Sequence, residues 1–219
     1  MVVVTKEGAK AIGDVAANCS VDVCACYPIT PTTHLTEQLS KHYSNGKISQ
    51  FIAVESEFAA ISALVGASAA GARTFTTTGG QGLLLMHEVL FSAAGMRLPI
   101  VMVVGNRAVS SPLNIWNDEQ DSISQRDSGW IQIYCKSNQE AADSVPQAFF
   151  IAEKTLLPVM VCMDGHYLTH AVEQIDIPEK DDIQKFLPKF NPAIKLDPKA
   201  PVSLGVYATP EHYQIFRED

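Results

Sequence analysis

Residues 55–82, ESEFAAISALVGASAAGARTFTTTGGQG, bring a helix pattern, a strand pattern and a glycine loop together in immediate succession. Small and apolar residues dominate 55–71, so we expect a helix that is buried on every face and that other backbones or a ligand can approach closely. Threonine and phenylalanine within 73–78 predict a strand. The glycines at 79, 80 and 82 then predict a loop around Gln81. This succession is typical of an α/β fold.

The same alternation of helix and strand patterns continues on both sides of this segment. Residues 99–104, PIVMVV, form a continuous apolar run, which is the pattern of a parallel strand covered on both faces. The pattern also predicts strands at 21–27, 48–54, 131–135 and 158–163, and helices at 5–19, after Pro31, at 83–94 and at 139–154. Together these elements predict the α/β fold class with a mainly parallel sheet.

Composition argues against several classes of protein. The formal net charge is −8, from 24 acidic and 16 basic residues, and no basic stripe is present, so we expect no nucleic-acid partner. No stretch approaches the roughly 18 apolar residues of a membrane helix, and the first residues lack the pattern of a signal peptide. The five cysteines, an odd number, fit reduced thiols. We therefore expect a cytoplasmic protein that does not enter a membrane.

The character of the chain changes near residue 170. Six prolines punctuate a charged stretch with little core pattern between 171 and 219. We interpret 1–170 as the α/β domain and 171–219 as a proline-rich connecting arm or tail toward a further domain.

Most of the unusual polar residues follow predicted strands. The loops concerned are 27–33, 55–57, 78–82, 105–127 and 164–170. In open α/β sheets such loops meet at the carboxyl ends of the strands and form a ligand crevice. Residues 106–128 are long and polar without periodicity, which is typical of a functional loop or a poorly ordered one. A solvated interface loop is the alternative for its residues Asn114, Asn117, Asp118, Asp121 and Arg126.

Four blocks of sequence, in order, are similar to one family. They are YPITP at 27–31, residues 55–90, residues 103–122 with the word GNRA, and residues 126–141. The chain resembles the N-terminal pyrimidine-binding domain of the alpha subunit of pyruvate:ferredoxin oxidoreductase (pyruvate synthase), whose relatives act on other 2-oxoacids. The resemblance covers roughly 5–170 and implies a three-layer thiamine-diphosphate-binding fold.

The resemblance also implies an activity and a set of partners. Such enzymes decarboxylate a 2-oxoacid on thiamine diphosphate, pass the acyl group to coenzyme A and reduce ferredoxin. The diphosphate-binding word GDG with its trailing Asn is missing here, since Asp164-Gly165 lacks both. A beta subunit would therefore supply that motif and Mg2+, while ferredoxin-like and gamma subunits would complete the complex and [4Fe-4S] clusters would lie on partner subunits. Two alternatives stay open: a non-catalytic assembly module, and half of another thiamine enzyme.

Glu57 is the first candidate catalytic residue. Thiamine loses a proton from C2 to its own 4′-amino group, and a carboxyl group hydrogen-bonded to N1′ makes that amino group basic. Such a carboxyl needs an apolar setting, and Glu57 opens the small, apolar helix. The resemblance places the catalytic glutamate of the family at the same residue. Glu55 is the alternative, and either acid also favours a helix N-terminus electrostatically.

Arg107 and Thr30 are candidates for substrate binding and catalysis. A guanidinium can hold the carboxylate of a 2-oxoacid through two parallel hydrogen bonds, and Arg107 follows an apolar strand. A surface ion pair is its alternative role. The resemblance places Thr30 near the substrate, where it can donate to the carboxylate or to a developing oxyanion. The alternative for Thr30 is turn formation beside Pro28 and Pro31.

The remaining cofactor-binding candidates lie in two loops. The resemblance implies that Pro28 and Ile29 shape the pocket, and that Thr78, Gly79, Gly80 and Gln81 lie against the cofactor ring. Glycine permits such close backbone approach. Relatives carry Ser-Ser-Gln-Gly or Ala-Ser-Gln-Gly here, so the hydroxyl contacts from positions 79 and 80 are lost. Many relatives also have His where this chain has Glu119, which leaves the preferred oxoacid open.

The six histidines have no metal-ligand spacing. His166 and His170 are four residues apart, but a strand pattern and an Asp-Gly turn precede them, which argues against a helical metal site. We therefore expect no metal ligands in this chain.

Overall fold

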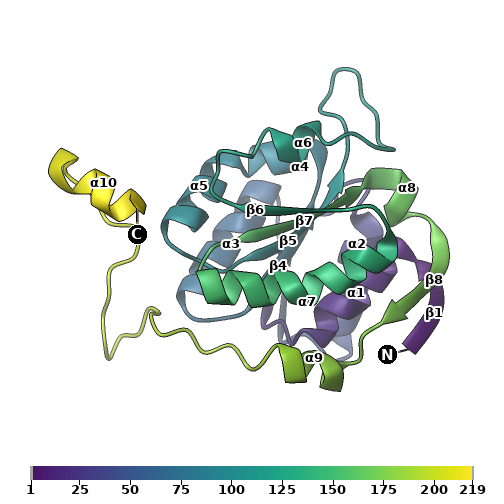
Figure 1. The fold of residues 1–219 in the computed structure, drawn as a ribbon, viewed down its shortest axis with the longest axis horizontal. Helices are drawn as coiled ribbons and strands as arrows, with labels where there is room; N and C mark the ends of the chain where they lie inside the picture. Colours follow the sequence, from purple (N-terminus) through teal and green to yellow (C-terminus); the bar gives the residue numbers. More distant parts are fainter. Residues whose placement is uncertain (1, 219) are drawn as a thin grey trace.

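A central sheet of parallel strands organises the chain in our computed structural model, which describes residues 2–218 (Figure 1). Its strand order is β3-β2-β4-β5-β7-β6, and a separate two-stranded sheet pairs β1 with β8. The strands are β1 Val2–Glu7, β2 Val23–Cys26, β3 Gln50–Ala53, β4 Thr74–Thr78, β5 Val101–Asn106, β6 Ile131–Cys135, β7 Val159–Asp164 and β8 Val172–Ile177. The helices are α1 Gly8–Asn18, α2 Thr33–Ser44, α3 Glu57–Ala69, α4 Gly80–Leu85, α5 His87–Gly95, α6 Gln120–Ile123, α7 Asn138–Thr155, α8 Gly165–Thr169, α9 Lys180–Phe186 and α10 Pro210–Glu218.

The sheet separates two hydrophobic cores. Helices α1, α2 and α7 pack on one face, and α3 and α5 pack on the other. Strand β5 serves both cores, because Val101 and Val103 face the first while Met102 and Val104 face the second. Alternate side chains of a strand point to opposite faces, so a strand covered on both sides must be apolar throughout. The predicted three-layer α/β fold with a parallel sheet is therefore confirmed.

Helix α3 differs from the prediction that it is buried on every face. Ala60, Ile61 and Leu64 are buried against the sheet, but Phe58 on the opposite side is 42% exposed. The helix is thus covered on one face within residues 2–218. Its small, apolar composition does not by itself say what lies against the second face.

The segment after residue 170 contributes more to the core than its composition predicted. Strand β8 pairs antiparallel with β1, and neither strand was expected from the sequence. Ile175, Ile183 and Leu187 are buried in the first core. Beyond them the chain runs to α10, which has no buried residue and stands away from the sheet in Figure 1. The division at residue 170 into domain and arm stays a prediction, but 172–187 pack on the α/β layers.

The cysteines are unpaired and buried, namely Cys19, Cys24, Cys26, Cys135 and Cys162. Burial raises the pKa of the Cys26 thiol to about 12, so it stays protonated at neutral pH. Such thiols behave as small core side chains. Among residues 2–218 we find no helix of the length and apolar character that crossing a membrane requires.

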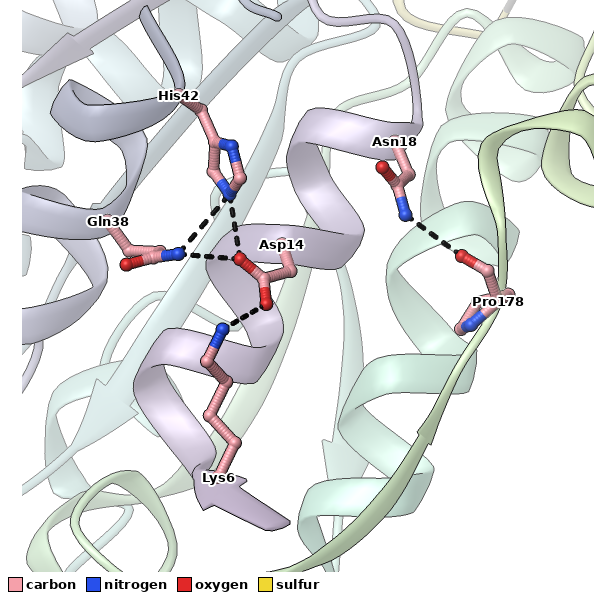
Figure 2. Close-up of polar contacts among 6 residues, drawn as sticks. All are labelled: Lys6, Asp14, Asn18, Gln38, His42 and Pro178. Carbon is pink, nitrogen blue, oxygen red and sulfur yellow. Dashed lines mark hydrogen bonds and ion pairs between the residues drawn. The ribbon is translucent and has the colours of Figure 1, made fainter. Parts of the chain in front are cut away.

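A polar cluster joins β1, α1 and α2 at one side of the molecule (Figure 2). Asp14 of α1 accepts hydrogen bonds from Lys6 Nζ at 2.5 Å, Gln38 Nε2 at 2.6 Å and His42 Nε2 at 2.7 Å. Burial raises the pKa of the Asp14 carboxyl, but the hydrogen bonds from His42, Lys6 and Gln38 outweigh burial and lower this pKa to about 2. The folded state therefore favours ionised Asp14.

Asp14→Asn should lower the free energy of unfolding at pH 7 by on the order of 1 kcal/mol, a modest value because the carboxyl is partly exposed and screened. The folded-state pKa lies below the ordinary 3.8, so the stabilisation is present above that value and is lost as pH falls toward about 2. Urea unfolding of both proteins at pH 7 and pH 3 measures the difference, which should shrink at pH 3.

Asp181→Asn, on the exposed side of α9, is the matched control and should leave stability unchanged. An equal loss for Asp14→Asn at both pH values would contradict the assignment of the effect to the ionised carboxyl.

Candidate active site

The sheet changes its winding direction at the place where the sequence predicts a ligand crevice. From β2 the chain proceeds to β3 at one edge, whereas from β4 it proceeds to β5 in the opposite direction, although β2 and β4 are neighbours. Such a switch point opens a crevice beyond the carboxyl ends of the two strands. The segments 27–33 and 79–82 leave the sheet here. Helices α4 and α6 lie beside each other at this end, and a long loop projects past them (Figure 1).

Glu57 is the first helical residue of α3 and is only 6% exposed. Ser56 caps the helix, because its hydroxyl accepts a hydrogen bond from Ala59 N at 3.2 Å. The carboxyl of Glu57 lies against Gly82, where an added Cβ would come within 2.5 Å of Oε1. Glu55 is exposed to solvent, so only Glu57 has the dry setting that the sequence argument required.

Thr78 ends β4 directly beside this carboxyl. Its hydroxyl would lie 2.7 Å from a Cβ at position 82 and is buried without a hydrogen-bond partner among residues 2–218. Buried hydroxyls normally find partners. The Thr78 hydroxyl is therefore open to a contact with a ligand, as are those of Thr74 and Thr77 in the same strand.

Arg107 approaches the same glycine loop from the end of β5. It is 6% exposed, and it donates from Nε to Thr30 O at 2.9 Å and from Nη1 to Gln81 Oε1 at 2.8 Å. The guanidinium lies over Gly80, whose φ of 53° and lack of a side chain make room for it. Burial lowers the pKa of Arg107, while the charges of Asp121 and Glu57 raise it. The Arg107 guanidinium thus lies in the electrostatic field of both carboxyl groups.

Asp121 positions both the glycine loop and Arg107. Nothing in the sequence distinguishes it from the other polar residues of its loop. It is fully buried in α6. Its Oδ2 accepts from Gly80 N at 2.7 Å and Arg107 N at 3.1 Å, and its Oδ1 accepts from Asn106 Nδ2 and Ser122 N, both at 2.8 Å. Burial raises the pKa of Asp121, and these hydrogen bonds oppose that rise. The carboxylate therefore fixes the backbone at both ends of the site.

The loop after β2 carries the other predicted residues. Pro28 and Thr30 are exposed and Ile29 is half-buried, so the loop borders the crevice. Thr30 contacts Arg107 through its backbone carbonyl. Gly79 lies so close to the Gly105 carbonyl oxygen that a side chain would not fit. The contacts thus connect Thr30 and the glycine loop with Arg107, while the roles of Pro28 and Ile29 stay predictions.

Most of the candidate polar residues in the long loop after Arg107 make contacts within that loop. Asn114 donates to the Asn117 carbonyl at 2.8 Å within the loop, Asp118 accepts from Gln120 N, and the exposed side chain of Arg126 pairs with Asp127. Glu119 is exposed at the start of α6. Asp121 is therefore the one member of that group that reaches the glycine loop.

A buried carboxyl, a buried guanidinium and a glycine-rich loop at the switch point of a three-layer parallel sheet are typical of a ligand-binding α/β domain. The family described as pyruvate flavodoxin/ferredoxin oxidoreductase, thiamine diphosphate-binding, matches residues 14–219. The chain belongs to this family, and the resemblance stated from its sequence blocks is confirmed.

Individual relatives of this family are similar to most of the chain. Pyruvate synthase subunit PorA of Methanosarcina barkeri is 52% identical over 99% of this chain and 54% of its own length, and that of Pyrococcus abyssi is 57% identical over 89% and 50%. Ketoisovalerate oxidoreductase subunit VorA of Pyrococcus abyssi is 47% identical over 90% and 50%. The chain spans about half the length of these relatives.

A solved structure is also similar. It is 2-oxoglutarate:ferredoxin oxidoreductase from Magnetococcus marinus with 2-oxoglutarate, coenzyme A and succinyl-CoA bound. The TM-score is 0.73 at 26% identity, over 90% of this chain and 34% of that one.

Asp121→Ala should lower the free energy of unfolding by about 3 kcal/mol, because it leaves buried donors without an acceptor. Asp127→Ala in the same loop, with a side chain 83% exposed, should change it by less than about 0.5 kcal/mol. Urea unfolding measures both. Similar losses for the two variants would contradict the positioning role of Asp121.

Proposed function

We propose that this chain supplies the pyrimidine-side half of a thiamine-diphosphate site in a 2-oxoacid:ferredoxin oxidoreductase that acts on pyruvate, forming acyl-CoA and CO2. The observation that carries the proposal is that the buried carboxyl of Glu57 and the buried guanidinium of Arg107 lie against the same glycine loop, at Gly82 and Gly80, at the switch point. Pyruvate is favoured because the pyruvate synthase relatives share more identity with this chain than the ketoisovalerate relative does. A cytoplasmic location stays a prediction.

The residues present fit thiamine diphosphate. Glu57 offers a carboxyl to a ring nitrogen, the unpartnered hydroxyl of Thr78 lies next to it, and Gly79, Gly80 and Gly82 keep side chains away. When bound, the cofactor supplies the carbanion chemistry that releases carbon dioxide from a 2-oxoacid. Glu57 would hold a proton between its carboxyl and that ring nitrogen, and the dry setting strengthens such a hydrogen bond.

Arg107 would bind the substrate carboxylate. In residues 2–218 its Nε and Nη1 donate to Thr30, Gln81 and Ala108, which leaves Nη2 for a ligand. The two parallel hydrogen bonds expected from the sequence would require Nη1 to leave Gln81. Thr30 is exposed beside this guanidinium, so it borders the position where the substrate would lie.

The site needs a second polypeptide. Phe58 of α3, Leu85 of α4 and Phe91 of α5 are exposed, and α3 packs against both of these helices, so they offer apolar surface that a partner would cover. The beta subunit would bring the diphosphate motif with Mg2+, and the ferredoxin-like and gamma subunits would carry electrons through [4Fe-4S] clusters to ferredoxin. Coenzyme A would accept the acyl group.

Glu57→Gln should abolish turnover, with a loss of more than about a hundredfold, because the amide cannot share a proton with the ring. The complex with its partner subunits is assayed for reduction of methyl viologen that depends on pyruvate and coenzyme A. Glu55→Gln, two residues earlier and exposed, is the control and should keep full activity. Full activity of Glu57→Gln in an intact complex would refute the assignment.

Gly82→Ala tests whether activity requires the close packing of the glycine loop against Glu57. Its Cβ would meet Glu57 Oε1 at 2.5 Å and Thr78 Oγ1 at 2.7 Å and push the carboxyl aside. Displacement of a catalytic group by about 1 Å costs about a hundredfold in rate, and the same assay measures it. Gly95→Ala in α5 has open space around it and should have no effect. Unchanged activity of Gly82→Ala would rule out the close packing as a requirement.

A further inference from the structure

A second cluster of ligand-type side chains lies outside the candidate active site. Glu7 ends β1, His34 lies in the first turn of α2, and His170 directly follows α8. Each offers one nitrogen or oxygen, and these atoms all lie within 4.8 Å of one another. Within 2–218 this is the one group of that kind.

Long-range pairing of the chain builds the cluster. In the β1–β8 ladder Glu7 pairs with Val172, and Gly8 N donates to Ala171 O at 3.0 Å, so Glu7 is held beside His170. His34 Nδ1 bonds Glu7 Oε1 directly. The rings of His34 and His170 have centroids 5.0 Å apart. Three separate elements therefore converge on one point.

The hydrogen bonds around His170 leave a ring nitrogen free. Thr169 Oγ1 lies 2.5 Å from Gly165 O and 2.7 Å from His170 Nδ1. A hydroxyl has a single proton, and the carbonyl can only accept, so Thr169 donates to Gly165 O and accepts from His170 Nδ1–H. The Nε2 lone pair of His170 is then available as a ligand. Metal-binding histidines almost always have such a second hydrogen bond.

The carboxylate of Glu7 is also held in position by a second partner. Its Oε2 pairs with Lys10 Nζ at 2.7 Å, which leaves Oε1 to face His34. The side chain of Glu7 is 11% exposed and that of His34 is 38% exposed. The carboxylate is thus held in place, while the His34 side gives an ion and a bound water access from solvent.

We propose that Glu7, His34 and His170 bind one divalent transition metal ion of the zinc type. Two imidazoles and a carboxylate form a ligand set that Zn2+ accepts, with bonds of about 2.0–2.2 Å and a fourth position for water. Small side-chain rotations of the exposed His34 would bring the ligand atoms to that spacing. His166, stacked on His170 at 4.5 Å between centroids, supports the ring from the side.

The bound metal would stabilise the segment 27–33, which borders the candidate active site. Gly165, at the start of the α8 turn, lies so close to Pro31 that a Cβ there would come within 3.1 Å of its ring. A metal joining β1, α2 and α8 would therefore stabilise the second half of the segment 27–33, from Pro31 to the start of α2. The proposal is independent of the cofactor assignment, because its test measures metal binding itself.

Titration of the tag-free, chelator-treated chain with ZnCl2 by calorimetry should give one ion per chain, and CoCl2 should give the visible absorption of tetrahedral Co2+. His34→Gln and His170→Gln should each weaken binding by at least about tenfold. Thr169→Val, which removes the acceptor for His170, should weaken it by about ten- to a hundredfold. His212→Gln, on the exposed α10, is the control and should bind as the unaltered chain does.

Circular dichroism establishes that each variant is folded, and Zn2+ should raise the melting temperature of the unaltered chain and of His212→Gln alone. Absence of stoichiometric binding would show that the cluster is only an ion-pair network of Glu7, Lys10 and His34, and would overturn the proposal. Equal affinity of His34→Gln, His170→Gln and His212→Gln would overturn it as well.

Discussion

Arg107 and Glu57 are charged side chains that the fold withdraws from water at the same edge of one sheet. Such burial is costly unless opposite charges and hydrogen-bond partners lie within reach, and here each charge lies in the field of the other. Gly80 and Gly82 make the approach possible because a Cβ at either position would collide with one of the two groups. Asp121 then fixes the backbone of Gly80 and Arg107 together. The geometry of the site depends on these buried charges and on the hydrogen bonds that hold them.

The parallel sheet provides the rigidity that the site needs. Strands β4 and β5 are buried on both faces, so the positions of Thr78 and Arg107 at their ends are set by two packed cores. Side chains in close-packed interiors have little freedom, which pre-organises the groups that follow. The connections that leave β2 and β4 run in opposite directions, so the loops after these two strands diverge.

Two polar clusters organise the part of the chain around β1, α1 and α2. Asp14 joins β1 and α1 to α2, and the β1–β8 ladder places Glu7 beside His170. Both clusters hold α2, which follows directly on the segment 27–33 that borders the site. The N-terminal strand and the first residues beyond 170 thereby support the crevice, although they lie outside the parallel sheet.

Local pattern determined the α/β class, the strands that become β4, β5 and β7, and the family, since those depend on residues close together in the chain. It also placed Glu57, Arg107 and the glycine loop at strand ends, where parallel topology must gather them. Only the tertiary structure decided that Asp121 rather than its polar neighbours reaches the site, that β1 pairs with β8, and that Glu7, His34 and His170 meet. Those contacts join residues from 14 to 175 positions apart, and the backbone and packing geometry that closes such distances leaves no period or spacing in the sequence.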